Sequence, residues 1–67
     1  MTKLHRRIRS LREAAGLTQE TLAAFCSVDK TAVSHWETGK SAPRASRIGL
    51  VAKALGVSIS ELYGEAA

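Results

Sequence analysis

The sequence of 67 residues is poor in the residues that build disulfides, metal centres and membrane spans. It has one cysteine and two histidines, so it offers neither an internal disulfide nor the four ligands of a structural metal site. Cys26 stands among apolar positions, and we expect a small buried hydrophobe rather than a reactive thiol. No apolar run approaches the roughly 18 residues that cross a bilayer, and no signal-peptide core is present. These absences predict a cytoplasmic protein without metal or cofactor.

Acidic residues are also few, and the charge is distributed unevenly along the chain. Ten lysines and arginines against six acids give a net charge of +4, which favours a polyanionic partner, nucleic acid first and an acidic membrane second. The first twelve residues contain cations and no acid: Lys3, Arg6, Arg7, Arg9 and Arg12. For any one of these arginines a solvated helix face is an equally good interpretation. The chain shows no nucleophile–base pair and no phosphate-cradling loop, so we do not expect an enzyme.

Apolar residues recur at helical spacing along the chain. The clearest stripes come from two segments: Leu4, Ile8, Leu11 and Ala15 in the first, and Ile48, Val51, Ala52 and Leu55 in the second. The pattern predicts five short helices, at residues 3–15, 19–26, 30–38, 44–55 and 59–63. A chain of this length favours one all-α domain over residues 1–67 with a single core.

Residues that begin and end helices stand at the expected boundaries. Four of them can cap a helix start through a side-chain oxygen: Thr2, Thr18, Asp29 and Ser58. The last of these precedes a glutamate by three residues, which is the spacing of a capping box. Gly16, Gly39 and Gly56 follow three of the segments, where glycine adopts a left-handed C-terminal cap without strain. Pro43 suits the first positions of the fourth helix.

Residues 18–40 are the most informative part of the sequence, because they predict two short helices joined by a tight turn at residues 27–28. On a helical wheel of the second helix, Val33, Trp36 and Glu37 share the inner side, and we expect Trp36 in the core. The outer side carries short polar and basic side chains: Lys30, Thr31, Ser34, His35 and Thr38. This pattern is typical of a helix-turn-helix that places its second helix in the DNA major groove. On periodicity alone, it also fits a solvated surface helix.

Together these residues resemble the Cro/phage-repressor type (XRE-like) of helix-turn-helix proteins. The resemblance covers about residues 4–63, and its order and spacing are more specific than a two-helix pattern alone. It rests on these pieces: residues 8–13 with 16–19, Leu22-Ala23, Val28, Val33, Trp36-Glu37, Gly39-Lys40 and residues 52–58. It implies a lambda-repressor-like DNA-binding fold, and the length of the chain is closer to a stand-alone Cro-type regulator than to a full repressor.

Three positions depart from the family pattern. Ser27 stands where the family usually has glycine, and we expect a positive φ there at a cost of about 1 kcal/mol. Phe25 stands where a charged residue is usual. It either packs on a partner subunit or folds back on its own domain, and we favour the second. Ala45 replaces a larger apolar residue, so we expect the fourth helix to lie closer to its neighbours.

The resemblance assigns the reading of bases mainly to the second helix of the motif. Lys30 and Thr31 are the strongest candidates, because lysine can donate to guanine and a threonine methyl can pack on a thymine methyl. His35 comes next and can bind either a base or a phosphate. Gln19, at the start of the preceding helix, is expected on the DNA backbone and sometimes on a base edge.

Other polar and basic side chains are expected to bind phosphates and so to fix the register without reading sequence: Ser34, Thr38, Lys40, Ser41, Arg44 and Arg47. For Arg47 a solvated face fits as well, and Arg6 and Arg7 are weaker candidates. The resemblance also implies a partly buried salt bridge between Arg12 and Glu37. A lone carboxylate on the inner side would be costly, so we interpret this pair as structural.

The function that follows is a sequence-specific regulator of transcription that binds double-stranded DNA, and a repressor where its operator overlaps a promoter. We expect a homodimer on a pseudo-palindromic operator, because one small domain makes few base contacts. Candidates for the dimer surface lie near the C-terminus, although most could equally be core: Val57, Ile59, Leu62 and Tyr63. Two alternatives remain. One is the DNA-binding antitoxin of a toxin–antitoxin pair, and the other is a protein-binding module without DNA contact.

Overall fold

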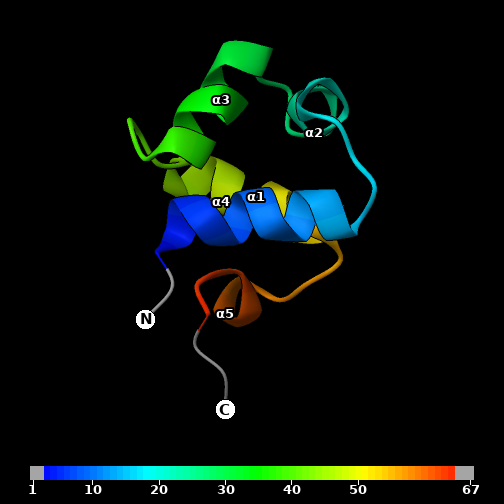
Figure 1. Cartoon of the computed structure of the whole chain (residues 1–67), viewed down its shortest axis with the longest axis vertical. Coiled ribbons are helices and arrows are strands. Elements are labelled where there is room, and N and C mark those ends of the chain that lie inside the picture. Colours follow the sequence, from blue (N-terminus) through cyan, green and yellow to red (C-terminus); the bar gives the residue numbers. More distant parts are fainter. Residues whose placement is uncertain (1–2, 65–67) are drawn as a thin grey trace.

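The computed structural model describes residues 3–64 and folds this range into five α-helices (Figure 1). They are α1 (Leu4–Ala14), α2 (Gln19–Phe25), α3 (Lys30–Thr38), α4 (Ala45–Leu55) and α5 (Ile59–Leu62). The all-α prediction is confirmed, and α3 has the predicted bounds. The other four helices are shorter than predicted by one residue at one or both ends.

The two helices of the predicted motif lie together at one end of the molecule. Figure 1 shows α2 and α3 at one end of the longest axis and α5 at the other, with α1 and α4 between them. In this arrangement α3 packs on α2 and α1, while α4 packs on α2 and α5. The motif therefore rests on a base of two longer helices, which leaves the opposite side of α3 uncovered.

The helix starts of the motif are fixed by side-chain caps, as the sequence predicts. The hydroxyl of Thr18 accepts a hydrogen bond from the backbone N–H of Thr21 at 3.0 Å. The carboxylate of Asp29 accepts one from the N–H of Thr31, also at 3.0 Å. Each cap satisfies a backbone donor that the helix itself leaves unpaired. For α1 the predicted cap Thr2 lies outside the described residues, and its N-cap position is taken by Lys3 without a side-chain bond.

Two positions in the motif need a left-handed backbone. Ser27 has φ +56°, as expected for the residue that replaces a family glycine, and the turn closes with the N–H of Val28 on the carbonyl of Ala23 at 3.0 Å. Gly39 ends α3 with φ +83°. This conformation favours glycine, and a Cβ there would also lie 3.2 Å from Nδ1 of His5, so the His5 ring would have to shift to admit a larger residue.

The core lies where the five helices meet, and it consists mainly of the predicted apolar stripes: Ile8, Leu22, Ala23, Cys26, Val33, Trp36, Val51, Ala52, Leu55 and Leu62. Burial raises the pKa of the Cys26 thiol. Phe25 keeps 49% of its surface exposed, so our expectation that it folds back on its own domain is wrong. The buried positions of α2 are Leu22 and Ala23, followed by the buried Cys26 just after the helix.

The start of α4 differs from the prediction in two respects. The helix begins after Arg44, which makes no side-chain cap, and the buried Pro43 precedes it instead of occupying its first turn. Ala45 is exposed, so this small residue does not bring α4 closer to the core.

A capping box and one arginine hold the short helix α5 in place. The hydroxyl of Ser58 accepts from the N–H of Glu61, and the Glu61 carboxylate accepts from the N–H of Ser58, each at 3.0 Å. Arg7 of α1 donates from Nη2 to the carbonyl of Glu61. Leu62 is fully buried, so its side chain belongs to the core and not to a dimer surface.

Candidate nucleic-acid interface

The helix α3 separates an apolar side from a polar one. Val33, Trp36 and Glu37 are buried, with 0%, 5% and 7% of their surfaces exposed, as the helical wheel predicts. Thr31 is exposed on the other side. The remaining predicted contact residues of α3 are also accessible, either exposed (Lys30, Thr38) or half-buried (Ser34, His35). Apart from its ends, this outer side of α3 is free to enter a groove.

The ends of the outer side carry weak local contacts. Lys30 Nζ lies 4.0 Å from a carboxylate oxygen of Glu20, but 60% of the lysine side chain is exposed, so the pair holds it only loosely. At the other end the Thr38 hydroxyl donates to the carbonyl of His35 at 3.4 Å. A phosphate oxygen could replace this long bond. Both side chains can therefore change partner at little cost.

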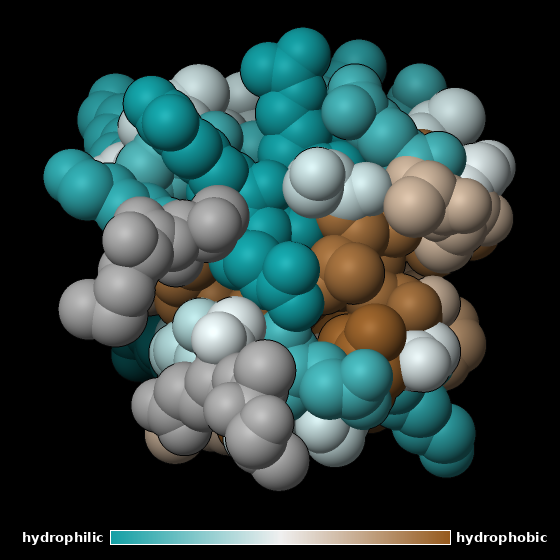
Figure 2. Space-filling model, turned by 60° about the horizontal axis from the view of Figure 1, so that its bottom comes forward, coloured by the Kyte–Doolittle hydropathy of each residue, from teal (hydrophilic) through white to brown (hydrophobic). Residues whose placement is uncertain are grey.

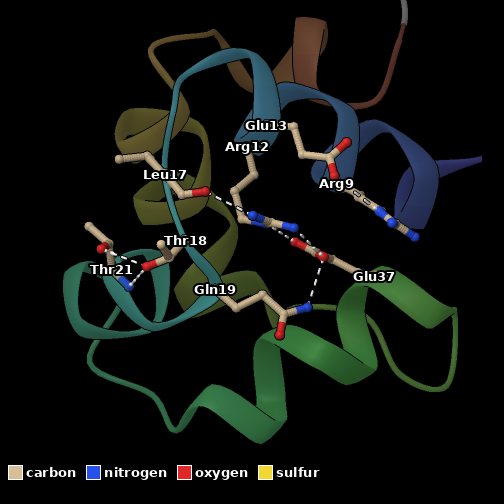
Figure 3. Close-up of polar contacts among 8 residues, drawn as sticks. All are labelled: Arg9, Arg12, Glu13, Leu17, Thr18, Gln19, Thr21 and Glu37. Carbon is tan, nitrogen blue, oxygen red and sulfur yellow. Dashed lines mark hydrogen bonds and ion pairs between the residues drawn. The ribbon is translucent and has the colours of Figure 1, made fainter.

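Behind α3, Arg12 and Glu37 form the ion pair that the resemblance implies (Figure 3). Arg12 Nε lies 2.5 Å from Oε2 and Nη2 lies 3.1 Å from Oε1 of Glu37, a two-pronged geometry that fixes both side chains. A third arginine nitrogen donates to the carbonyl of Leu17 at 2.8 Å. Only 12% and 3% of the two side chains are exposed. The hydrogen bond to Glu37 raises the pKa of Arg12 above its ordinary value.

The structure adds Gln19 to this ion pair, which the sequence analysis did not anticipate. Its amide nitrogen Nε2 donates to Oε1 of Glu37 at 3.0 Å (Figure 3). The bond uses one of two amide hydrogens and leaves the other hydrogen and the amide oxygen for a further partner. The sequence did contain a signal for such a donor, because a buried carboxylate usually accepts more hydrogen bonds than a single partner supplies.

The segment after α3 brings several of the predicted phosphate-binding side chains together. Ser41, Arg44 and Arg47 line a cleft of about 560 Å³, to which Ser46 adds a hydroxyl that the prediction did not include. Lys40 is exposed just before this cleft. The first turn of α4 has neither a side-chain cap nor an acidic residue, which favours an anion at this helix start.

Two donors near these surfaces already have partners within the fold. The N–H of Ser41 donates to the carbonyl of His35 at 3.3 Å and helps to close α3. Arg7, a weaker phosphate candidate, is bound to the Glu61 carbonyl of α5 instead.

Among the dimer candidates, Ile59 and Tyr63 expose 47% and 43% of their surfaces, whereas Val57 is half-buried against the core.

Two further observations concern residues 3–64 only. No group of three or more histidine, cysteine, aspartate or glutamate side chains in this range could hold a metal ion. None of its helices combines the length and apolar character needed to cross a membrane.

This geometry defines an all-α helix-turn-helix domain with an accessible second helix. The chain matches the family described as Helix-turn-helix (HTH_3) over residues 8–62. It belongs to this family, in its XRE/Cro-type branch. One curated relative is the HTH-type transcriptional activator BcrR of Enterococcus faecalis, 37% identical over 60 residues. That match covers 90% of this chain and 29% of BcrR, so the chain spans less than a third of this relative.

Two solved structures resemble the whole domain. One is the P22 c2 repressor protein in complex with synthetic operator 9T, with a TM-score of 0.87, 27% identity and coverage of 92% of this chain and 94% of the other. The second is the restriction-modification controller protein C.AhdI from Aeromonas hydrophila, with a TM-score of 0.84 and 37% identity. This match covers 90% of our chain and 91% of C.AhdI.

Proposed function

We propose that this chain binds double-stranded DNA in a sequence-specific manner and regulates transcription, acting as a repressor where its operator overlaps a promoter. The observation that carries the proposal is the accessible outer side of α3. It is flanked at its C-terminal end by cations (Lys40, Arg44 and Arg47) that form no ion pair within residues 3–64. Its family and the operator complex of the similar P22 c2 repressor support it. With such a partner, we place the chain in the cytoplasm and do not expect an enzyme.

We assign the reading of bases to side chains at the N-terminal half and the middle of α3. Lys30 suits the acceptors of guanine and Thr31 suits a thymine methyl, while His35 can reach a base or a phosphate. Gln19 contributes the amide hydrogen that Glu37 leaves free, directed to a phosphate or a base edge. Phosphate contacts come from the residues around them: Ser34, Thr38, Lys40, Ser41, Arg44 and Arg47.

We further propose that two copies bind a pseudo-palindromic operator. Two recognition helices must lie about 34 Å apart to enter the major groove at two half-sites that are one helical turn apart on the same side of the DNA. The domain measures 32 × 22 × 22 Å, so two copies in contact have centres about 22–32 Å apart, a distance of the same order as this spacing. Ile59 and Tyr63, with the half-buried Val57, supply apolar surface near α5. Figure 2 is turned so that the α5 end of the molecule comes forward, and it shows apolar side chains gathered on the right of this view.

Selection of duplex DNA from a random pool at about 150 mM salt tests this proposal, because non-specific phosphate binding is weak there. We expect enrichment of a two-fold symmetric site whose half-sites lie about one helical turn apart. Weak binding without sequence preference would contradict it, and would indicate that Lys30 and Thr31 do not read bases.

A second candidate is supported by the exposed aromatic ring of Phe25 at the end of α2, which is 49% accessible. A DNA-binding antitoxin would use such a residue to bind its toxin. Co-purification with the product of a neighbouring gene, lost in Phe25→Ser, would favour this function over that of a regulator without a protein partner.

A further inference from the structure

The cations near the start of the chain divide into two groups in the structure. Arg12 is bound to Glu37 and Arg7 to α5, so these two hold helices together. Arg6 and Arg9 are exposed instead. Arg9 lies 3.5 Å from a carboxylate oxygen of Glu13, and Arg6 forms no ion pair within residues 3–64. Such an exposed pair contributes little to folding, so stability does not explain why these two guanidinium groups stand here.

Arg6 and Arg9 line a cleft of about 460 Å³ between α1 and the C-terminal end of α3. Ser10 of α1 and Thr38 of α3 add hydroxyl groups to the same cleft. At its edge the His5 ring packs against Gly39, which holds the first turn of α1 beside the end of α3. The cleft is therefore a fixed part of the fold and adjoins the outer side of α3.

The charge of this cleft is positive, although two carboxylates line it. Glu37 is neutralised by Arg12 and also accepts from Gln19. Glu13 lies beside Arg9, and Figure 3 shows both on α1 near the Glu37 carboxylate. This leaves the charge of Arg6 without a counterion among the described residues. Guanidinium groups together with hydroxyls are the donors that bind phosphate oxygens.

We infer that this cleft binds a backbone phosphate of the same duplex that α3 reads, so that α1 extends the contact past the C-terminal end of α3. The inference rests on the proposed function. Two observations support it. The positive charge of the cleft complements a phosphate, and the cleft is continuous with the outer side of α3, because Thr38 belongs to both and the exposed Lys40 follows two residues later. The occupant is a phosphodiester group, and the contact adds affinity without base preference.

The test measures DNA affinity against salt for Arg6→Gln and Arg9→Gln, using a duplex that carries the selected site. Each variant should weaken binding several-fold and make the slope of log affinity against log salt shallower by about 0.9, the value for one phosphate. Lys53→Gln is the matched control. It removes one charge from an exposed position in the last turn of α4, outside both clefts, and should leave the slope close to that of the wild type.

Duplexes with a single neutral methylphosphonate then locate the contact. We expect one position where the neutral group weakens binding of the wild-type chain but not of Arg6→Gln, because the variant has already lost that contact. Circular dichroism should be unchanged in all variants, since the substituted side chains are exposed.

Unchanged slopes for Arg6→Gln and Arg9→Gln would overturn the inference, and would favour an acidic protein as the occupant. Equal changes in Lys53→Gln would overturn it too, because the effect would then reflect net charge and not the cleft. These failures differ from failure of the proposed function, in which the wild-type chain itself would select no site.

Discussion

Two charged residues of α3 differ in their surroundings. Glu37, on the inner side, accepts three hydrogen bonds and leaves 3% of its side chain exposed. Lys30, at the start of the same helix, has 60% of its side chain exposed and lies 4.0 Å from a carboxylate oxygen of Glu20. The contrast is physical in origin. A buried charge must be paired, and its geometry is then fixed. An exposed charge keeps its water and can exchange it for a partner at low cost. We infer that the inner charges set the angle of α3 and the outer ones serve recognition.

Removing an inner charge should produce the largest effect. Glu37→Ala leaves the guanidinium of Arg12 buried without its partner, and the free energy of unfolding should fall by about 3–5 kcal/mol. Urea denaturation followed by circular dichroism measures this loss. Thr38→Ala, the exposed neighbour, is the control and should change stability by less than about 0.5 kcal/mol. Similar losses in both variants would mean that the ion pair is not the structural element we describe.

On the outer side, Lys30→Ala should leave stability unchanged and alter base preference. Loss of a base contact should reduce discrimination at one position of each half-site by about 1–3 kcal/mol. Affinities for the selected site and for its single-base variants measure this. If all sites weaken by the same factor, Lys30 binds a phosphate and our assignment is incorrect.

Lys40→Ala should have a smaller and uniform effect. Because Lys40 is assigned to a phosphate, every sequence should bind more weakly by the same factor, and the salt slope should become shallower by about 0.9. Anisotropy titrations at several salt concentrations measure both quantities. A change confined to one base position would place Lys40 among the reading residues.

The smallest expected effect is the pH dependence of the cap of α3. The hydrogen bond from the Thr31 N–H lowers the pKa of Asp29 below its ordinary value. A lowered pKa in the folded chain means that the stabilisation is present above the unfolded pKa, about 3.9, and is lost as pH falls through the folded pKa. Thermal melts of the wild type and Asp29→Asn should therefore converge on acidification. A constant difference between them would show that the charge is not responsible.

Features of the fold that depend on residues close in sequence could be predicted, whereas contacts between helices could not. Thr18 and Asp29 cap their helices as predicted because a cap involves residues two or three apart. The bond of Gln19 to Glu37 was missed because it depends on how α2 crosses α3, which periodicity does not give.

The short helix α5 shows the same limit. Its four residues are too few for a helical period to separate the buried Leu62 from the exposed Ile59, so both entered the predicted dimer surface. The redirection of Arg7 to Glu61 likewise depends on the packing of α5 against α1. The roles of the contact residues remain predictions, because they depend on DNA.

The most direct test of base reading by the outer side of α3 is to repeat the selection from random duplex DNA with two variants. Lys30→Ala changes the first residue of α3, and Lys40→Ala changes a residue just after its end. We predict that Lys30→Ala keeps the two-fold symmetry and half-site spacing but changes the preferred base at one position of each half-site. Lys40→Ala should select the wild-type sequence with lower affinity. If the two variants select the same sequences, α3 does not read bases through its first turn, and the central claim is contradicted.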